Sequence, residues 1–189
     1  QKQYVSAIHM YEQADLLQPD NIWTVKHLAQ CYKLSDKLEK ALDYYRKVEA
    51  VQPDNLDIAL QIGQVLVRME NYKEALSYFY KVEYLEKNPV NAQRAIAWCS
   101  FVSGKYDEAL KYYHLLLEGA SPKAHDWMNA GHVYFVMRQV PQAIQHYQQA
   151  QSSEKSHSDF IEKFNKDRNV LLTQGLTEED LQIILDLLL

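Results

Sequence analysis

Histidine side chains are the groups in this sequence best suited to bind a metal or transfer protons, and their spacing favours neither role. Seven histidines are present, but no HExxH, CxxC or His-x-x-x-His motif occurs. His125 and His132 lie on one face of a predicted helix, yet seven residues of helix separate them by about 10 Å along its axis. A metal bound by both would need a third element between them. We therefore predict surface histidines and no metal site.

Motifs for nucleophilic or phosphate chemistry are also missing from the sequence. There is no glycine-rich phosphate loop and no G-x-S-x-G turn, and no strand pattern that would carry either. The paired acids Glu178 and Glu179 follow Thr177, which is typical of the first turn of a helix. We expect no enzyme activity and no cofactor.

Charge and composition exclude two further classes of function. The chain has 189 residues, of which 47% are hydrophobic and 24% charged, and a net charge of −5. Acidic and basic residues are interspersed, so no basic stripe is available for nucleic acid. No apolar run approaches the roughly 20 residues of a membrane span, and no signal peptide is visible. These features predict no nucleic-acid partner, no membrane insertion and a cytoplasmic location.

The elements that would position any functional group follow a strict repeat. Alanine recurs every 34 residues without insertion, at Ala7, Ala41, Ala75, Ala109 and Ala143. Four places later each alanine is followed by an aromatic residue: Tyr11, Tyr45, Phe79, Tyr113 and Tyr147. Three places further on stands a compact apolar residue: Ala14, Val48, Val82, Leu116 and Ala150. Antiparallel helices that pack about 8–10 Å apart need small side chains where their axes cross.

A second small residue lies twelve places before each of the last four alanines, at Ala29, Gly63, Ala97 and Gly131. Together these columns resemble the tetratricopeptide repeat (TPR) family, whose unit is a 34-residue helix hairpin. The resemblance implies an all-α fold, a right-handed α-solenoid of TPR hairpins closed by a C-terminal capping helix. Cys31 and Cys99 then stand two repeats apart, too far for a disulfide, and we expect small apolar packing residues.

The repeat phase predicts three segments. Residues 1–21 match the second helix of a truncated TPR, residues 22–157 match four complete TPR units, and residues 158–189 match an atypical helical cap. A lone second helix leaves one apolar face uncovered, so we expect at least one more helix upstream. Within the first complete unit we predict helices over 22–34 and 37–51, and within the cap one helix over 158–173 and another over 178–188.

The resemblance also implies a binding surface, because the first helix of each TPR hairpin lines a concave groove. We expect a protein or peptide partner there, drawn by cations at the N-terminal end and by aromatic side chains at the C-terminal end. An alternative leaves those aromatic side chains packed on neighbouring helices or beneath the terminal helix. The residues implied are Trp23, Lys26, Gln30, Lys33, Leu60, Gln64, Arg68, Arg94, Trp98, Phe101, Met128, His132 and Phe135.

One specialised role is disfavoured by the residues present. Chaperone-binding members of the family hold a terminal carboxylate between Lys, Asn and Arg at fixed repeat positions. In this chain only the first of those positions matches, and the five are Lys26, Gln30, Gln61, Asn91 and Ala95. Charge-assisted recognition of a carboxylate at these positions is therefore largely lost.

Three roles remain open from the sequence. We expect a non-enzymatic TPR scaffold that mediates protein–protein interaction through its inner groove. The first alternative is a self-association module, in which the apolar C-terminal helix forms a homodimer. The second is a chaperone for a secreted protein.

Overall fold

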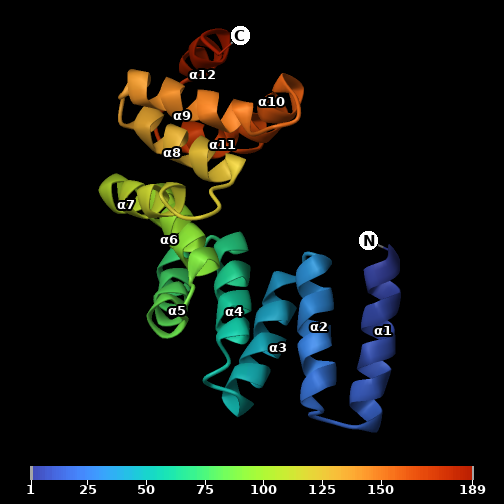
Figure 1. Ribbon diagram of the computed structural model, residues 1–189. Helices are drawn as coiled ribbons and strands as arrows, with labels where there is room; N and C mark the ends of the chain where they lie inside the picture. Colours follow the sequence, from blue (N-terminus) through green and yellow to red (C-terminus); the bar gives the residue numbers. More distant parts are fainter. Residues whose placement is uncertain (1, 189) are drawn as a thin grey trace. The chain divides into compact units, whose positions relative to one another are not determined.

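The computed structural model describes residues 2–188, and within them every regular element is an α-helix. Residues 1 and 189, the outer limits of the predicted segments, lie outside the described residues. The fold class predicted from the repeat is confirmed. The helices, drawn in Figure 1, are α1 Lys2–Leu17, α2 Ile22–Leu34, α3 Leu38–Val51, α4 Leu56–Arg68, α5 Tyr72–Leu85, α6 Val90–Val102, α7 Tyr106–Leu117, α8 Ala124–Val136, α9 Val140–Ser152, α10 His157–Lys166, α11 Arg168–Thr173 and α12 Glu178–Asp186.

The chain divides into two compact units, which we describe separately: unit 1 ends at Ala92 and unit 2 begins at Gln93. In unit 1, α2 packs on α3 and α4 packs on α5, and α3 packs on α4 between them. Asparagine begins three of these helices. Asn21, Asn55 and Asn71 accept hydrogen bonds from backbone N–H groups of α2, α4 and α5, which satisfies donors that the helix itself leaves unpaired.

The repeated small and aromatic residues form the contacts between paired helices. Ala41, Tyr45, Ala75 and Phe79 are all at most 1% exposed. Gly63 of α4 lies so close to Phe79 of α5 that a Cβ atom there would stand 2.5 Å from the ring. In unit 2 the same close approach recurs between Gly131 of α8 and Tyr147 of α9, where the distance would be 2.7 Å. The small residues therefore set how near the two helices can come.

The turn between the two helices of each hairpin uses one left-handed residue. These residues are spaced 34 apart in sequence, and they are Asp36 (φ 63°), Glu70 (φ 59°), Gly104 (φ 73°) and Arg138 (φ 62°). Only one of the four is glycine, the residue that adopts this conformation without steric cost. The turn conformation is thus common to the hairpins, although its sequence is not.

The C-terminal cap in unit 2 corrects one prediction. The helix expected over residues 158–173 is two helices, α10 and α11, with a break at Asp167 (φ −94°, ψ 0°). Leu171 of α11 is fully buried, and the Gln174 side chain, just beyond α11, donates to the carbonyl of Val102 at 3.1 Å and accepts from the Tyr106 hydroxyl at 2.8 Å. The break therefore lets α11 reach the turn between α6 and α7.

Candidate functional site

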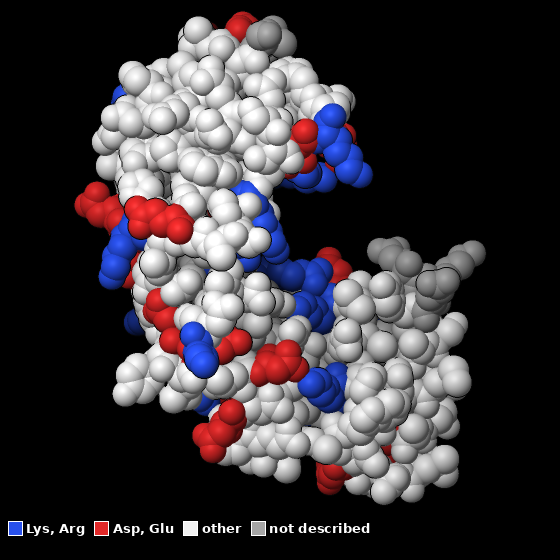
Figure 2. All heavy atoms as spheres, in the orientation of Figure 1, with Lys and Arg blue, Asp and Glu red and all other residues white. Residues whose placement is uncertain are grey.

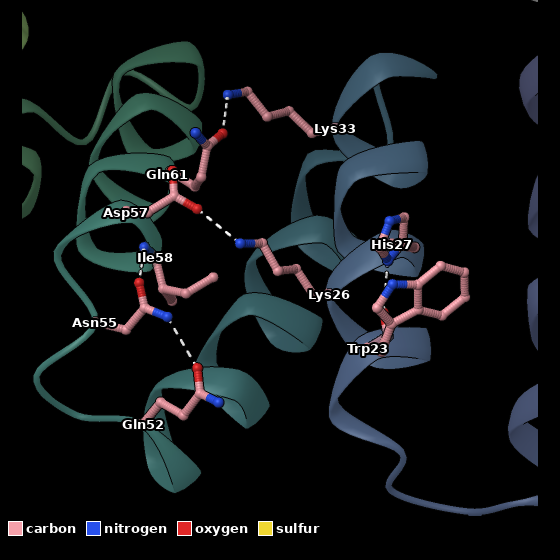
Figure 3. A network of polar contacts seen from close by, with 9 residues as sticks. All are labelled: Trp23, Lys26, His27, Lys33, Gln52, Asn55, Asp57, Ile58 and Gln61. Atoms are coloured by element: carbon pink, nitrogen blue, oxygen red, sulfur yellow. Dashed lines mark hydrogen bonds and ion pairs between the residues drawn. The ribbon is translucent and has the colours of Figure 1, made fainter.

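The α2–α4 face of unit 1 is formed by polar side chains of two neighbouring first helices: Lys26, Gln30 and Lys33 from α2, and Asp57, Gln61, Gln64 and Arg68 from α4. Figure 3 shows how Lys26 and Lys33 extend from α2 toward α4. In Figure 2, Lys/Arg and Asp/Glu atoms are interspersed over the region where Figure 1 places these helices. The predicted cations of unit 1 thus lie together on one face.

Two of the cations on the α2–α4 face already have acidic partners. Lys26 Nζ lies 2.8 Å from Asp57 Oδ2. Arg68 donates from Nη2 to Asp36 Oδ1 at 2.7 Å and from Nη1 to the backbone carbonyl of Lys33 at 2.6 Å. These pairs are partly exposed, and each contributes little to stability.

Lys33 differs, because both of its side-chain partners are neutral. Its ammonium group donates to Gln61 Oε1 at 2.7 Å and to Gln64 Oε1 at 2.5 Å, and the side chain is half-buried. Burial lowers the pKa of Lys33, the Arg68 guanidinium lowers it further, and Asp57 raises it. A carboxylate arriving beside Lys33 would favour its charged form. Lys33 is therefore the strongest candidate on this face for contact with an anion.

Trp23, predicted to contact a partner, lies in an aromatic stack at the start of α2. Its side chain is 58% exposed. Its ring centroid lies 3.9 Å from that of His27 and 5.7 Å from that of Tyr11 on α1. His27 is fixed by its Nδ1 atom, 2.7 Å from the Trp23 carbonyl oxygen (Figure 3). Trp23 is accessible, and its ring contacts are with His27 of α2 and Tyr11 of α1.

Arg94 of unit 2 was predicted to attract a partner, but it forms a largely buried ion pair instead. Arg94 Nε and Nη2 donate to the two carboxylate oxygens of Asp126, at 2.8 Å and 3.0 Å. The Arg94 side chain is 15% exposed and that of Asp126 is fully buried. Asp126 also accepts from the Lys123 backbone N–H at the start of α8. Arg94 therefore joins α6 to α8, and attraction of an external acid is excluded while this pair is intact.

Four predicted binding residues are buried in unit 2. Phe101 is fully buried, Met128 is 2% exposed, His132 is fully buried and Phe135 is 4% exposed. Phe164 of α10 covers His132, with ring centroids 5.3 Å apart. Phe101 lies against Tyr106 of α7 and Phe135 against Tyr147 of α9, so both pack on neighbouring helices. The 34-residue pattern could not show the contact of His132 with Phe164, because α10 lies outside it.

His132 has a polar environment despite its burial. Its Nδ1 atom lies 2.9 Å from the Tyr147 hydroxyl, and its Nε2 atom lies 3.4 Å from Asp167 Oδ2 without a well-formed hydrogen bond. Burial raises the pKa of Tyr147 well above its ordinary value, and Asp167 raises it further. We interpret the three side chains as a polar contact between the cap and the last hairpin.

Of the remaining predicted residues, Gln30 is exposed, and Leu60, Gln64 and Trp98 are partly exposed. The pairing of these cations with acidic side chains was not predicted from the sequence. A signal for them existed: Lys26 and Asp57 are 31 residues apart, and both Asp36–Arg68 and Arg94–Asp126 are 32 apart. Opposite charges separated by nearly one repeat length therefore indicate pairing between successive repeats.

Among residues 2–188, no three His, Cys, Asp or Glu side chains are grouped so that they could hold a metal ion. None of the helices described is both long and apolar enough to cross a bilayer. Both cysteines are free thiols, and burial raises the pKa of Cys99 to about 12, so this thiol is inert at neutral pH.

Comparison with known proteins agrees with this architecture. Models described as tetratricopeptide repeat match residues 27–55 and residues 60–125. The chain therefore belongs to the TPR family. No curated protein sequence matches it significantly.

Several solved structures share the fold. YrrB, described as a TPR protein with an unusual peptide-binding site, aligns with a TM-score of 0.70 and 23% identity over 86% of this chain and 84% of its own. A tetratricopeptide repeat protein from Parabacteroides merdae aligns with a TM-score of 0.73 and 19% identity, over 100% of this chain and 78% of its own. MamA aligns with a TM-score of 0.69 and 15% identity, over 86% and 91%. At these identities the likeness concerns the fold alone.

Proposed function

We propose that this protein is a protein-interaction scaffold whose α2–α4 face binds an extended peptide segment carrying an acidic side chain. The TPR fold generally serves as a non-enzymatic scaffold and offers extended binding surfaces. One relative of this fold, YrrB, is described as having a peptide-binding site. The α2–α4 face, rather than its counterpart in unit 2, keeps predicted binding residues accessible.

The observation that carries this proposal is the environment of Lys33. Lys26, Arg68 and Arg94 have carboxylate partners, whereas the described partners of the Lys33 ammonium are two glutamine amides. A carboxylate from a partner can replace one of these neutral acceptors with a charge-assisted hydrogen bond. The exposed Leu34 and the half-buried Leu60 and Val67 provide apolar contacts beside it.

The proposal is tested by selecting phage-displayed linear peptides of about a dozen residues on the immobilised protein, then measuring their affinity by fluorescence anisotropy. We expect selected peptides to share an Asp or Glu next to an aliphatic residue. Lys33→Gln should weaken their binding about tenfold, because a hydrogen bond to a charged group contributes about 1.5–3 kcal/mol. Added salt should weaken binding to the unaltered protein more than binding to the variant.

The matched control is Lys87→Gln, which removes one exposed positive charge between α5 and α6. Peptide affinity should not change in this variant. Selected peptides without acidic residues, or equal losses in Lys33→Gln and Lys87→Gln, would rule out recognition at Lys33.

A second candidate, self-association through α12, is favoured by two exposed side chains. Ile183 is 59% exposed and Leu187 is 54% exposed, and they lie four residues apart on one helix face. Leu181, Ile184 and Leu188 are buried against the cap and are not available for this role. Light scattering should show a dimer that the double change Ile183→Glu and Leu187→Glu converts to a monomer. A monomer without the changes excludes this candidate.

A further inference from the structure

Two polar contacts join α3 to α5, the second helices of the two hairpins of unit 1. The Tyr78 hydroxyl of α5 donates to Glu49 Oε2 of α3 at 3.1 Å. Arg46 Nη2 of α3 lies 2.7 Å from Glu74 Oε1 of α5. Because the sequence repeats every 34 residues, α1 and α3 carry residues at the same four positions, and the two pairs of helices can be compared directly.

The first of these contacts is not formed between α1 and α3. Asp15 holds the position of Glu49 and is one methylene group shorter, and Tyr44 holds the position of Tyr78. Among residues 2–188, Asp15 Oδ1 is buried and has no hydrogen-bond partner. Burial raises the pKa of the Tyr44 hydroxyl, and the nearby carboxylates of Asp15 and Glu12 raise it further. A buried carboxylate oxygen therefore lies near Tyr44 without a donor.

The second contact is replaced by interactions with Tyr32 of α2. Glu12 and Lys40 hold the positions of Arg46 and Glu74, with the charges exchanged. Glu12 Oε1 accepts a hydrogen bond from the Tyr32 hydroxyl at 2.6 Å. The Lys40 ammonium nitrogen lies 5.3 Å from the centroid of the Tyr32 ring. The Glu12 and Lys40 side chains thus contact Tyr32 rather than each other.

A cavity of about 700 Å³ lies at this junction, and we call it the α1–α3 cavity. Its lining includes Glu12 from α1, Tyr32 from α2, and Tyr44 and Lys47 from α3. The ring centroids of Tyr32 and Tyr44 are 5.3 Å apart, and the Lys47 ammonium nitrogen lies 4.5 Å from the Tyr44 centroid. The tyrosine faces already hold positively charged groups, which the electron-rich face of an aromatic ring attracts.

Among the described side chains, the charge beside the cavity that lacks a partner is negative. Of the three cations in the lining, Arg46 already forms an ion pair, and Lys40 and Lys47 lie over tyrosine rings. Glu12 and Asp15 are three residues apart on α1, so their carboxylates lie on the same helix face. An anion would enter beside both carboxylates, whereas a cation would supply the missing donor to Asp15.

We propose that the α1–α3 cavity binds an arginine side chain of a partner protein, with the guanidinium group against the Tyr44 ring and hydrogen-bonded to Glu12 and Asp15. A guanidinium group carries five N–H donors in one plane, so it can bond to two carboxylates and stack on an aromatic ring at once. A lysine ammonium group is a point charge without this planar geometry. The exposed Lys47 side chain would move from the Tyr44 ring into solvent. This site does not depend on the α2–α4 face and selects the opposite charge.

Titration with a small probe, followed by NMR of the backbone amide signals, tests the proposal. The probe is Nα-acetyl-arginine amide, and Nα-acetyl-citrulline amide is its matched control, because citrulline has nearly the same shape without the charge. We expect the arginine probe to shift the signals around Glu12 and Tyr44 at millimolar concentrations, and the citrulline probe to leave them unchanged. Glu12→Gln should weaken binding of the arginine probe about tenfold, because a neutral acceptor replaces a charged one.

Two further variants separate the shape of the site from its charge. Asp15→Glu keeps the charge but reproduces Glu49, which bonds to its tyrosine. This variant should weaken binding of the arginine probe about threefold without lowering the midpoint of thermal unfolding. Lys47→Met frees the Tyr44 ring and removes a competing cation, so it should strengthen binding about threefold. Loss of folding cannot produce such a gain.

Lys33→Gln, on the α2–α4 face, should leave the affinity for the arginine probe unchanged, which separates the two sites. Three results would overturn the proposal. They are an equal response to the arginine and citrulline probes, an unchanged affinity in Glu12→Gln, and a stronger response of the same signals to inorganic phosphate, which would assign the cavity to an anion.

Discussion

Lys33 and Arg94 are both cations on first helices, yet the residues opposite them give them different roles. Lys33 faces two glutamine amides on α4, whereas Arg94 faces a fully buried carboxylate on α8. A partly buried cation with neutral acceptors can still interact with an external anion. A cation committed to a buried carboxylate cannot leave without exposing or stranding that carboxylate.

Arg94→Met should therefore destabilise the protein strongly. The change leaves Asp126 buried with its two guanidinium hydrogen bonds missing, and removal of one partner of such a pair typically costs about 3–5 kcal/mol. Urea unfolding monitored by circular dichroism gives the free energy of unfolding. Arg46→Met is the matched control, because both partners of the Arg46–Glu74 pair are exposed. Loss of this pair should lower the free energy of unfolding by less than about 1 kcal/mol. Similar losses in both variants would contradict a structural role for Arg94.

Phe135→Ala and Trp98→Ala should separate packing from surface accessibility. Phe135 is 4% exposed, with its ring centroid 6.5 Å from that of Tyr147 on α9, so its truncation should lower the free energy of unfolding by about 3–5 kcal/mol. Trp98 is half-buried, so its truncation should lower the free energy of unfolding by less. Thermal unfolding of the two single variants measures the difference. If the Phe135→Ala protein is as stable as the unaltered one, Phe135 is not a packing residue and remains a candidate for contact with a partner.

The sequence predicted residue types at the packing columns but not the partners of the charged side chains. Ala41, Tyr45 and Phe79 are buried as their spacing required. Periodicity places Lys33 and Arg94 on the same kind of helix face, and it contains no information on whether Asp126 becomes buried beside one of them. That outcome depends on side-chain geometry at the start of α8.

At the scale of elements, the turn within each hairpin keeps the same backbone conformation although the residue type at its left-handed position varies. Asp36, Glu70 and Arg138 adopt the left-handed conformation that Gly104 adopts without strain. A non-glycine residue in this conformation costs about 1–2 kcal/mol. Arg138 forms an ion pair with Asp180, 2.8 Å away, whereas the Glu70 side chain is exposed.

Glu70→Gly should stabilise the protein by about 1 kcal/mol, because it relieves the left-handed strain while changing only an exposed side chain. Gly104→Ala provides the reciprocal change and should destabilise by a similar amount, although nothing within 4 Å would obstruct the added Cβ atom. Chemical denaturation of both variants measures these shifts. Opposite signs from those stated would show that side-chain contacts, not backbone conformation, decide the preference at this turn.

Helix boundaries followed the sequence where the repeat is regular and departed from it in the cap. The predicted helix 22–34 coincides with α2, and 37–51 differs from α3 by one residue. The predicted helix 158–173 divides at Asp167, since the apolar spacing continues through the break. The Gln174 side chain beyond α11 bonds to Val102 and Tyr106, and local spacing cannot reveal a contact between residues so far apart in the sequence.

At the scale of the whole molecule, many tyrosines and one cysteine are buried in their protonated forms. Burial raises the pKa of Tyr45 and of Cys99 to about 12, and raises those of Tyr113 and Tyr147 well above the ordinary value. Unfolding would release these protons at the ordinary pKa values of 10.0 for tyrosine and 9.0 for cysteine. Between these ordinary values and the raised ones, the folded state binds more protons than the unfolded state.

The free energy of unfolding should therefore be unaffected by these groups below pH 9 and fall as pH rises from about 9 to 12. Each group contributes about 1.4 kcal/mol per pH unit in the interval between its two pKa values. Urea midpoints at pH 8, 9, 10 and 11 measure the dependence. Tyr45→Phe keeps the aromatic ring that Phe79 provides one repeat later and should make the decline shallower. A decline of unchanged slope in that variant would exclude Tyr45 as a contributor.

The invariant spacing of 34 residues and the shared turn conformation have a genetic consequence. An in-frame loss of residues 56–89 joins Asn55 to Val90, and each remaining helix keeps its phase relative to the next. Duplication of the same stretch has the equivalent effect in the other direction. The coding sequence can thus gain or lose whole repeats without shifting the phase of the remaining helices, so the number of first helices can vary independently of the side chains that each of them presents.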